Sequence, residues 1–133
     1  MTAGCGGLFQ IQTDVKGNIS FWHPENYDND MNCEWYMEIP PGSLFLMNYA
    51  RFHLESRTDE VCSNDYVLIR SGNKNDTADV SSLPILAKHC GYAIPPSLLV
   101  QATNILIRFH SNSEHNYRGF IISYSIIKEI IPN

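Results

Sequence analysis

The stretch CEWYMEI, residues 33–39, decides the fold class of this chain. Apolar side chains occupy every second position from Cys33 to Ile39, and glutamate or tyrosine fills the positions between them. Because successive side chains of a strand point to opposite faces, this alternation predicts a strand with one buried face and one wet face. No stretch of helical length repeats apolar residues at the helical spacing of three or four. The chain is therefore expected to be all-β.

Four further stretches have the composition of strands, and the last has apolar residues on both faces, as a central strand would. They are Leu44–Leu54, Tyr66–Arg70, Asn104–His110 and Gly119–Ile127. Polar, turn-rich segments separate them. Short strands joined by turns, with no helices between them, predict an antiparallel β-sandwich or jelly roll.

The composition bounds the function. The chain has 133 residues, 44% of them hydrophobic and 17% charged, which is typical of one globular domain. Its formal net charge is −5 and no window forms a basic stripe, which argues against nucleic acid and anionic membrane surfaces and leaves cationic ligands open. No apolar run approaches the roughly 18 residues that a membrane span needs, so direct membrane insertion is not expected.

Catalytic and transition-metal patterns are missing from the sequence. The five histidines show no H-x-x-x-H or H-E-x-x-H spacing. There is no G-x-S-x-G elbow, and the glycine-rich opening at residues 4–7 lacks the lysine of a phosphate loop. We therefore expect a chain that is not an enzyme.

Four cysteines, Cys5, Cys33, Cys62 and Cys90, allow three disulfide pairings. Their spacings favour two local loops, because Cys5 and Cys33 are separated by 28 residues and so are Cys62 and Cys90. Zinc is the competing interpretation, but zinc ligands usually come as tight C-x₂₋₄-C pairs and none is present. Disulfides are therefore expected.

Two glycosylation sequons begin at Asn18 and Asn75. Each is expected at the surface, Asn75 in a loop and Asn18 next to a strand. Together with the cysteines they indicate an oxidising, extracellular compartment. Met1 is not followed by a basic and then an apolar region, so no signal peptide is predicted and the chain is expected to be part of a larger or processed protein.

The cysteines, aromatic residues and glycines also form an ordered series of short motifs. The series consists of Cys5-Gly6-Gly7, Pro24-x-x-Tyr27, Cys33-x-Trp35, Phe52-x-Leu54-Glu55, Cys62-x-x-Asp65-Tyr66, Cys90-Gly91, Phe109-x-Ser111 and Gly119-Phe120. It resembles the CUB domain over about residues 5–126. The resemblance implies a jelly-roll-like β-sandwich of about ten strands with Cys5–Cys33 and Cys62–Cys90 bridges. It also implies one domain over residues 5–127, with residues 1–4 and 128–133 as flanking linkers.

Many CUB domains hold one Ca²⁺, and the resemblance carries their ligands onto this sequence. Glu55 and Asp65 fall on two ligand positions, and Tyr27 falls on the tyrosine that supports the carboxylates. Asn112 stands where the family has a third carboxylate. Because calcium accepts amide oxygens but binds more weakly as ligand charge is removed, a site with Asn112 is expected to be weaker than an all-carboxylate one.

The resemblance implies a non-catalytic, extracellular module that binds a protein ligand, stabilised by calcium and excised from a larger secreted or membrane-anchored protein. The calcium-site carboxylates would accept a Lys or Arg of the partner. One alternative is a metal-free, spermadhesin-like protein that binds carbohydrate or sulfated glycan or forms dimers; against it stand Glu55 and Asp65, which such members usually lack. Another is a regulatory domain of an extracellular protease.

Overall fold

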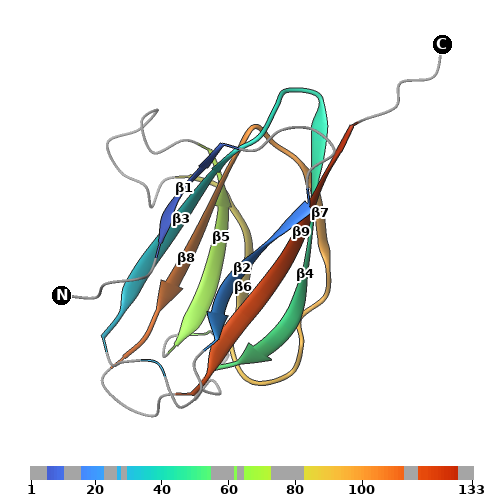
Figure 1. The fold of residues 1–133 in the computed structure, drawn as a ribbon. Helices are drawn as coiled ribbons and strands as arrows, with labels where there is room; N and C mark the ends of the chain where they lie inside the picture. Colours follow the sequence, from blue (N-terminus) through green and yellow to red (C-terminus); the bar gives the residue numbers. More distant parts are fainter. Residues whose placement is uncertain are drawn as a thin grey trace.

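The structure is a computed structural model that describes residues 6–10, 16–22, 27, 30–54, 62, 65–72, 83–112 and 117–128. Within these residues nine strands form two packed sheets and no helix occurs (Figure 1). The strands are β1 (Gly7–Gln10), β2 (Lys16–Trp22), β3 (Asn32–Glu38), β4 (Ser43–His53), β5 (Tyr66–Ser71), β6 (Ile85–His89), β7 (Leu98–Gln101), β8 (Asn104–His110) and β9 (Gly119–Lys128). The predicted β-sandwich is confirmed.

One sheet has the strand order β1-β3-β8-β5-β6 and the other has the order β2-β9-β4-β7. All neighbours are antiparallel except β1 and β3, which run parallel. The antiparallel sandwich therefore includes one parallel pair, at this edge. The physical reason is the path of the chain, because β2 lies in the opposite sheet and two reversals of direction return β3 to the direction of β1.

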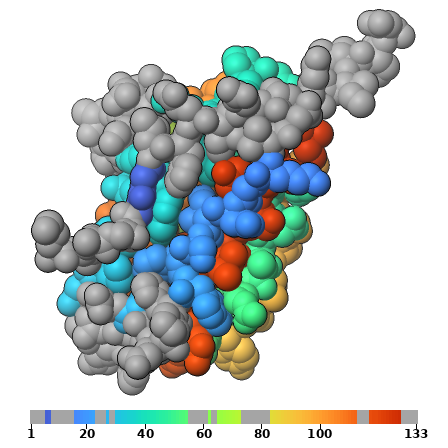
Figure 2. Space-filling model, in the orientation of Figure 1, coloured from blue at the N-terminus to red at the C-terminus, as the bar shows by residue number. Residues whose placement is uncertain are grey.

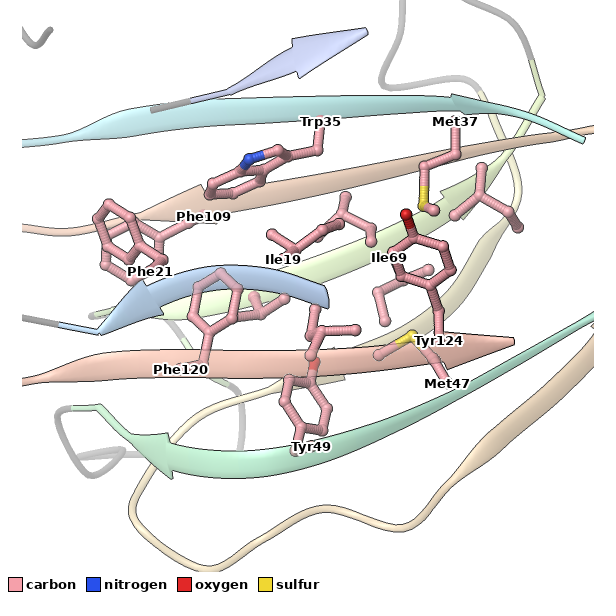
Figure 3. Packing of buried hydrophobic residues seen from close by; sticks show 14 of the residues in the cluster. Ile19, Phe21, Trp35, Met37, Met47, Tyr49, Ile69, Phe109, Phe120 and Tyr124 are labelled. Carbon is pink, nitrogen blue, oxygen red and sulfur yellow. The ribbon is translucent and has the colours of Figure 1, made fainter. Parts of the chain in front are cut away.

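The core lies between the two sheets and is rich in aromatic rings (Figure 3). Phe21 belongs to an aromatic group at one end of this core, with ring centroids of Phe109, Phe120 and Trp35 at 4.8, 5.6 and 5.9 Å from its own. Full burial of such a side chain contributes about 1.5–3 kcal/mol relative to exposure. The 33–39 alternation works as predicted, since Trp35 and its apolar neighbours two residues away are buried.

Strand β4 changes phase in its middle. The buried positions are odd-numbered up to Tyr49 and even-numbered from Phe52 onward. A β-bulge between Tyr49 and Arg51 produces this shift, because Tyr49 pairs with Ile122 and Arg51 with Ile121, so that Ala50 is left over. As a result Ala50 and Arg51 both point away from the core.

Gly119, the first residue of β9, is required by its surroundings. Its φ of 108° is one that L side chains rarely adopt, and an added Cβ would lie 1.9 Å from the carbonyl oxygen of Phe21 on β2. The absence of a side chain thus allows β9 to begin in close contact with the end of β2.

Candidate functional site

Asp65 is the centre of the candidate site. It directly precedes β5, and its side chain is fully buried. The Tyr27 hydroxyl donates a hydrogen bond to its Oδ2, and the backbone N–H of Asn112 donates to its Oδ1 at 2.8 Å. Burying a carboxylate without hydrogen-bond partners strongly destabilises a fold, so these two donors stabilise the buried position of Asp65.

Two loops meet above this carboxylate, one leading into β3 and one following β8. The N–H of Asp30 donates to the carbonyl of Asn112 at 2.9 Å, and the N–H of Ser111 donates to the carbonyl of Met31 at 3.0 Å. The buried Ser111 hydroxyl in turn accepts the N–H of Met31 at 2.8 Å. The backbone around Asp65 is therefore held by several bonds between segments far apart in sequence.

The structure brings Tyr27, Asp65 and Asn112 together, and it does so in part by contacts that side-chain types do not reveal. Asn112 contacts Asp65 through its backbone N–H, a group that every residue except proline carries. Ser111 belongs to the Phe109-x-Ser111 motif, but the sequence predicted no role for it. Its burial and its hydrogen bond with Met31 show that it supports the site. Glu55 lies outside the described residues.

The donor set has the chemistry that a hard cation prefers. Asp65 offers carboxylate oxygens, each with lone pairs beyond the one that accepts a hydrogen bond, and Asn112 carries an amide oxygen. Among the described residues, however, no group of three or more His, Cys, Asp or Glu side chains is placed to hold a metal. A calcium ion bound at Asp65 would thus take its further ligands from Glu55, from amide or backbone carbonyl oxygens, or from water.

His110 borders the site at the end of β8. Its Nδ1 lies 3.0 Å from the Oδ1 of Asn32, and its ring packs 5.1 Å from that of Tyr66. Burial lowers the pKa of His110, and the Asp65 carboxylate acts in the opposite direction. The effect of burial is the larger, so the His110 ring takes up a proton less readily than an exposed imidazole.

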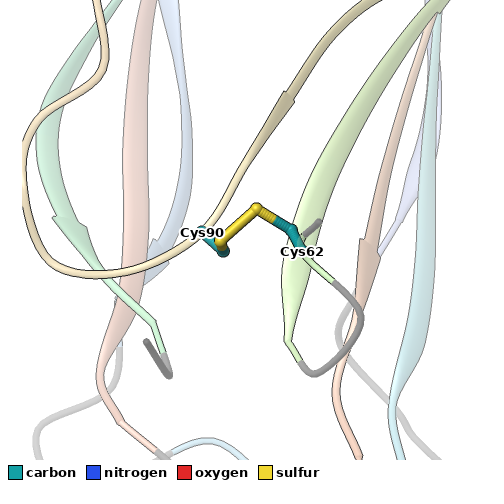
Figure 4. The surroundings of a disulfide bond; sticks show 2 residues. All are labelled: Cys62 and Cys90. Carbon is teal, nitrogen blue, oxygen red and sulfur yellow. A yellow bond between two sulfur atoms is a disulfide. The ribbon is translucent and has the colours of Figure 1, made fainter. Parts of the chain in front are cut away.

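A disulfide joins Cys62 to Cys90, with the two Cα atoms 5.7 Å apart (Figure 4). This confirms one of the two predicted pairs. Cys33 is also disulfide-bonded, but Cys5, its predicted partner, lies outside the described residues. Next to Cys90, the Nδ1 of His89 lies 3.2 Å from the Tyr49 hydroxyl; burial lowers the pKa of His89 and raises that of Tyr49.

The two sequons differ in what the structure describes. Asn18 is exposed on β2, which is an edge strand of its sheet, so its side chain is accessible. Asn75 lies outside the described residues. No helix within the described part of the chain is long and apolar enough to cross a membrane.

The sequence profile of the CUB domain matches residues 5–124. This chain belongs to the CUB domain family. Human cubilin is 33% identical over 124 residues, which cover 92% of this chain and 3% of cubilin. Human neuropilin-2 is 31% identical over 126 residues, covering 93% of this CUB domain and 12% of neuropilin-2. The chain thus spans only a small part of these relatives.

Solved structures share the fold. The CUB1-EGF-CUB2 domains of human MASP-1/3 superpose with a TM-score of 0.72 at 26% identity, covering 92% of this chain and 42% of that one. The MASP-1 CUB2 domain bound to Ca²⁺ gives a TM-score of 0.71 at 24% identity, covering 91% of this chain and 99% of that one. The CUB domain described here is accordingly an extracellular domain homologous to binding modules.

Proposed function

We propose that this CUB domain is a non-catalytic module that binds a protein ligand outside the cell and is stabilised by calcium. The observation that carries the proposal is the buried Asp65 carboxylate, held by the Tyr27 hydroxyl and the Asn112 N–H where two loops meet. The two donors offset part of the cost of burying this charge, and a bound cation would offset more of it.

In this proposal Glu55, Asp65 and the Asn112 amide hold the ion, and Tyr27 orients the Asp65 carboxylate. Calcium takes six to eight oxygen ligands at about 2.3–2.6 Å, so backbone carbonyls or water would complete the shell. When bound, the ion supplies positive charge that offsets the clustered oxygens and ties the loops together. The solved MASP-1 CUB2 structure is described as bound to Ca²⁺, and its likeness to this chain is one of fold.

The partner contact follows from charge. Because Asp65 is fully buried, a Lys or Arg of the partner would donate instead to Glu55 or to another oxygen at the rim of the site, in a charge-assisted bond. The net charge of −5 favours approach of such a cationic group. One small contact gives weak binding, so useful affinity would come from several such domains acting together in a longer protein.

The test is a calcium titration by calorimetry, with Asp65→Asn and Glu55→Gln as site variants. Glu38→Gln is the matched control, because it removes one carboxylate at the opposite end of β3 from the site. Wild type and the control are expected to bind, and both site variants are expected to lose binding. If wild type shows no heat and no calcium-dependent rise in Tm, the domain is metal-free and this part of the proposal is wrong.

Asn112→Asp tests the third ligand position. Restoring a negative charge is expected to tighten calcium binding, since affinity rises with ligand charge. At a concentration one hundred times Kd, a ligand that binds only the folded state stabilises it by about 2.7 kcal/mol, which would raise Tm by several degrees. An unchanged affinity in Asn112→Asp, combined with loss in Glu55→Gln, would show that Asn112 does not contact the ion.

A further inference from the structure

The outer face of the four-stranded sheet carries basic side chains on several of its strands. Although the net charge is −5, none of the described Asp or Glu residues lies on this face. Glu34 and Glu38 are on β3 in the other sheet, and Asp30 and Asp65 are in loops. Figure 2 shows atoms of β2, β9 and β4 side by side on the surface turned to the viewer. Among the residues that the structure describes, no carboxylate on this face neutralises that positive charge.

The positive charge is concentrated around one indole ring. The Arg51 guanidinium carbon lies 5.3 Å from the centroid of Trp22, and that of Arg118 lies 6.0 Å from the same centroid. Both arginines are exposed, and neither forms an ion pair with a carboxylate in the described part of the chain. The β4 bulge and the side-chain-free Gly119, which pairs with Trp22, place the three groups at one corner. Two positive charges that contact the same ring favour the approach of an anion to this corner.

The same face has apolar side chains away from that corner. Leu46 on β4 pairs with Leu99 on β7, and Leu99 is 58% exposed. Ile127 on β9 pairs with Leu44 and is 39% exposed. Leu99 and Ile127 are two of the five exposed large apolar side chains among the described residues. The face therefore combines a positively charged corner at Trp22 with an apolar area at Leu46 and Leu99.

This composition matches that of protein–protein interfaces, where arginine and aromatic residues are enriched and aspartate and glutamate are depleted. Trp and Arg are also the residues that most often dominate binding energy. We propose that the outer face of the four-stranded sheet docks a partner protein whose contacting segment presents carboxylates to Arg51 and Arg118 and apolar side chains to Leu46 and Leu99. A sulfated glycan fits less well, because the leucines offer its hydroxyls no hydrogen bonds.

Overall attraction between the partner and this acidic domain is not needed. At physiological ionic strength charges are screened over about 8 Å, so the local arginine pair decides what binds at the corner. The proposal rests on the proposed function only in that the chain is a protein-binding module. It requires no calcium, because none of the groups that form the face contacts Asp65.

The two tryptophans make the face observable by NMR. Trp22 lies on it, whereas Trp35 is buried in the core and serves as an internal reference. The probe is the capped hexapeptide acetyl-(Glu-Leu)₃-amide, compared with acetyl-(Gln-Leu)₃-amide, and the protein is produced without N-linked glycans because Asn18 lies on the same strand as Trp22. We expect saturable shifts of the Trp22 indole signal with the acidic peptide, little change at Trp35, and at least several-fold weaker binding of the amide peptide.

Variants assign the binding to the corner. Arg51→Gln and Arg118→Gln are each expected to weaken binding of the acidic peptide by about tenfold, a loss within the range that truncating an interface residue produces. Lys88→Gln is the matched control, since Lys88 also places a cation over an aromatic ring, 4.4 Å from the Tyr66 centroid, but in the other sheet. It is expected to bind like wild type.

Several results would overturn the proposal. These are the absence of a Trp22 shift at millimolar peptide, equal binding by wild type and the Arg51→Gln/Arg118→Gln double variant, and tighter binding of a heparin-derived sulfated oligosaccharide than of the peptide. Binding that disappears with EDTA or in Asp65→Asn would assign the peptide to the calcium site and also contradict it. Peptide binding that persists in EDTA supports it, even if the calorimetry shows that no calcium binds.

Discussion

Replacing Tyr27 with Phe removes the hydroxyl that donates to Asp65 and changes little else, because the two rings have the same shape. The carboxylate is fully buried, so water does not replace the lost donor. A hydrogen bond to a charged group contributes about 1.5–3 kcal/mol, and leaving a buried charge under-satisfied lies at the upper end of that range. For a domain of this length the expected loss corresponds to a fall in Tm of about 5–15 °C.

Tyr49→Phe is the control for this prediction. Tyr49 is equally buried, but its hydroxyl partner is His89, whose pKa is lowered by burial, so the bond joins two neutral groups. Its removal is expected to cost only about 0.5–1.5 kcal/mol. Both variants would be unfolded in urea with the disulfides intact and with EDTA present, so that bound metal does not mask the difference. If Tyr27→Phe costs no more than Tyr49→Phe, the argument from the buried charge is refuted.

Three further outcomes are expected. Gly119→Ala should prevent folding or destabilise the domain by more than about 3 kcal/mol in urea unfolding, since its Cβ overlaps backbone, whereas Gly42→Ala, with positive φ but open space around it, should cost only about 1–2 kcal/mol. Burial lowers the pKa of His89 below its unfolded value of 6.5, so as the pH falls the unfolded chain binds this proton before the folded chain does. The urea concentration at the unfolding midpoint should therefore be highest above pH 6.5 and decrease as the pH falls below it. His89→Gln should reduce this dependence of the midpoint on pH. Replacing both Cys62 and Cys90 by Ser should lower stability by about 3.5 kcal/mol, measured the same way, and an unchanged midpoint would contradict the loop-entropy argument.

The central strands were predictable from the sequence, and the edge strands were not. Residues 33–39 and Leu44–Leu54 correspond to β3 and β4 within one residue at each end. The first was predictable from its strict alternation and the second from its long apolar and aromatic composition. β6 and β7 have no fully buried residue. An edge strand that is half-exposed on both faces leaves no two-residue pattern to detect.

The residues of the candidate site were likewise predictable only in part. Asp65 and Tyr27 were found through motifs, and the hydrogen bond between them is consistent with the supporting role expected of Tyr27. The bond from the Asn112 N–H and the support from Ser111 depend on where two loops cross, which side-chain identity does not encode. The arginines around Trp22 lie at positions 51 and 118, too far apart in sequence for any local pattern to join them.

The bulge in β4 also bears on how the length of this strand can vary. Ala50 has no partner in β9, since the ladder passes from Tyr49 directly to Arg51. Deleting a residue of β4 outside the bulge would turn every side chain beyond the deletion from the core to the solvent or the reverse. Deleting Ala50 would leave Tyr49 and Phe52 inside and Arg51 outside, as they are now, and deleting Arg51 would leave Ala50 outside in its place. Within β4, the two exposed bulge residues are therefore where a one-residue deletion is compatible with the core.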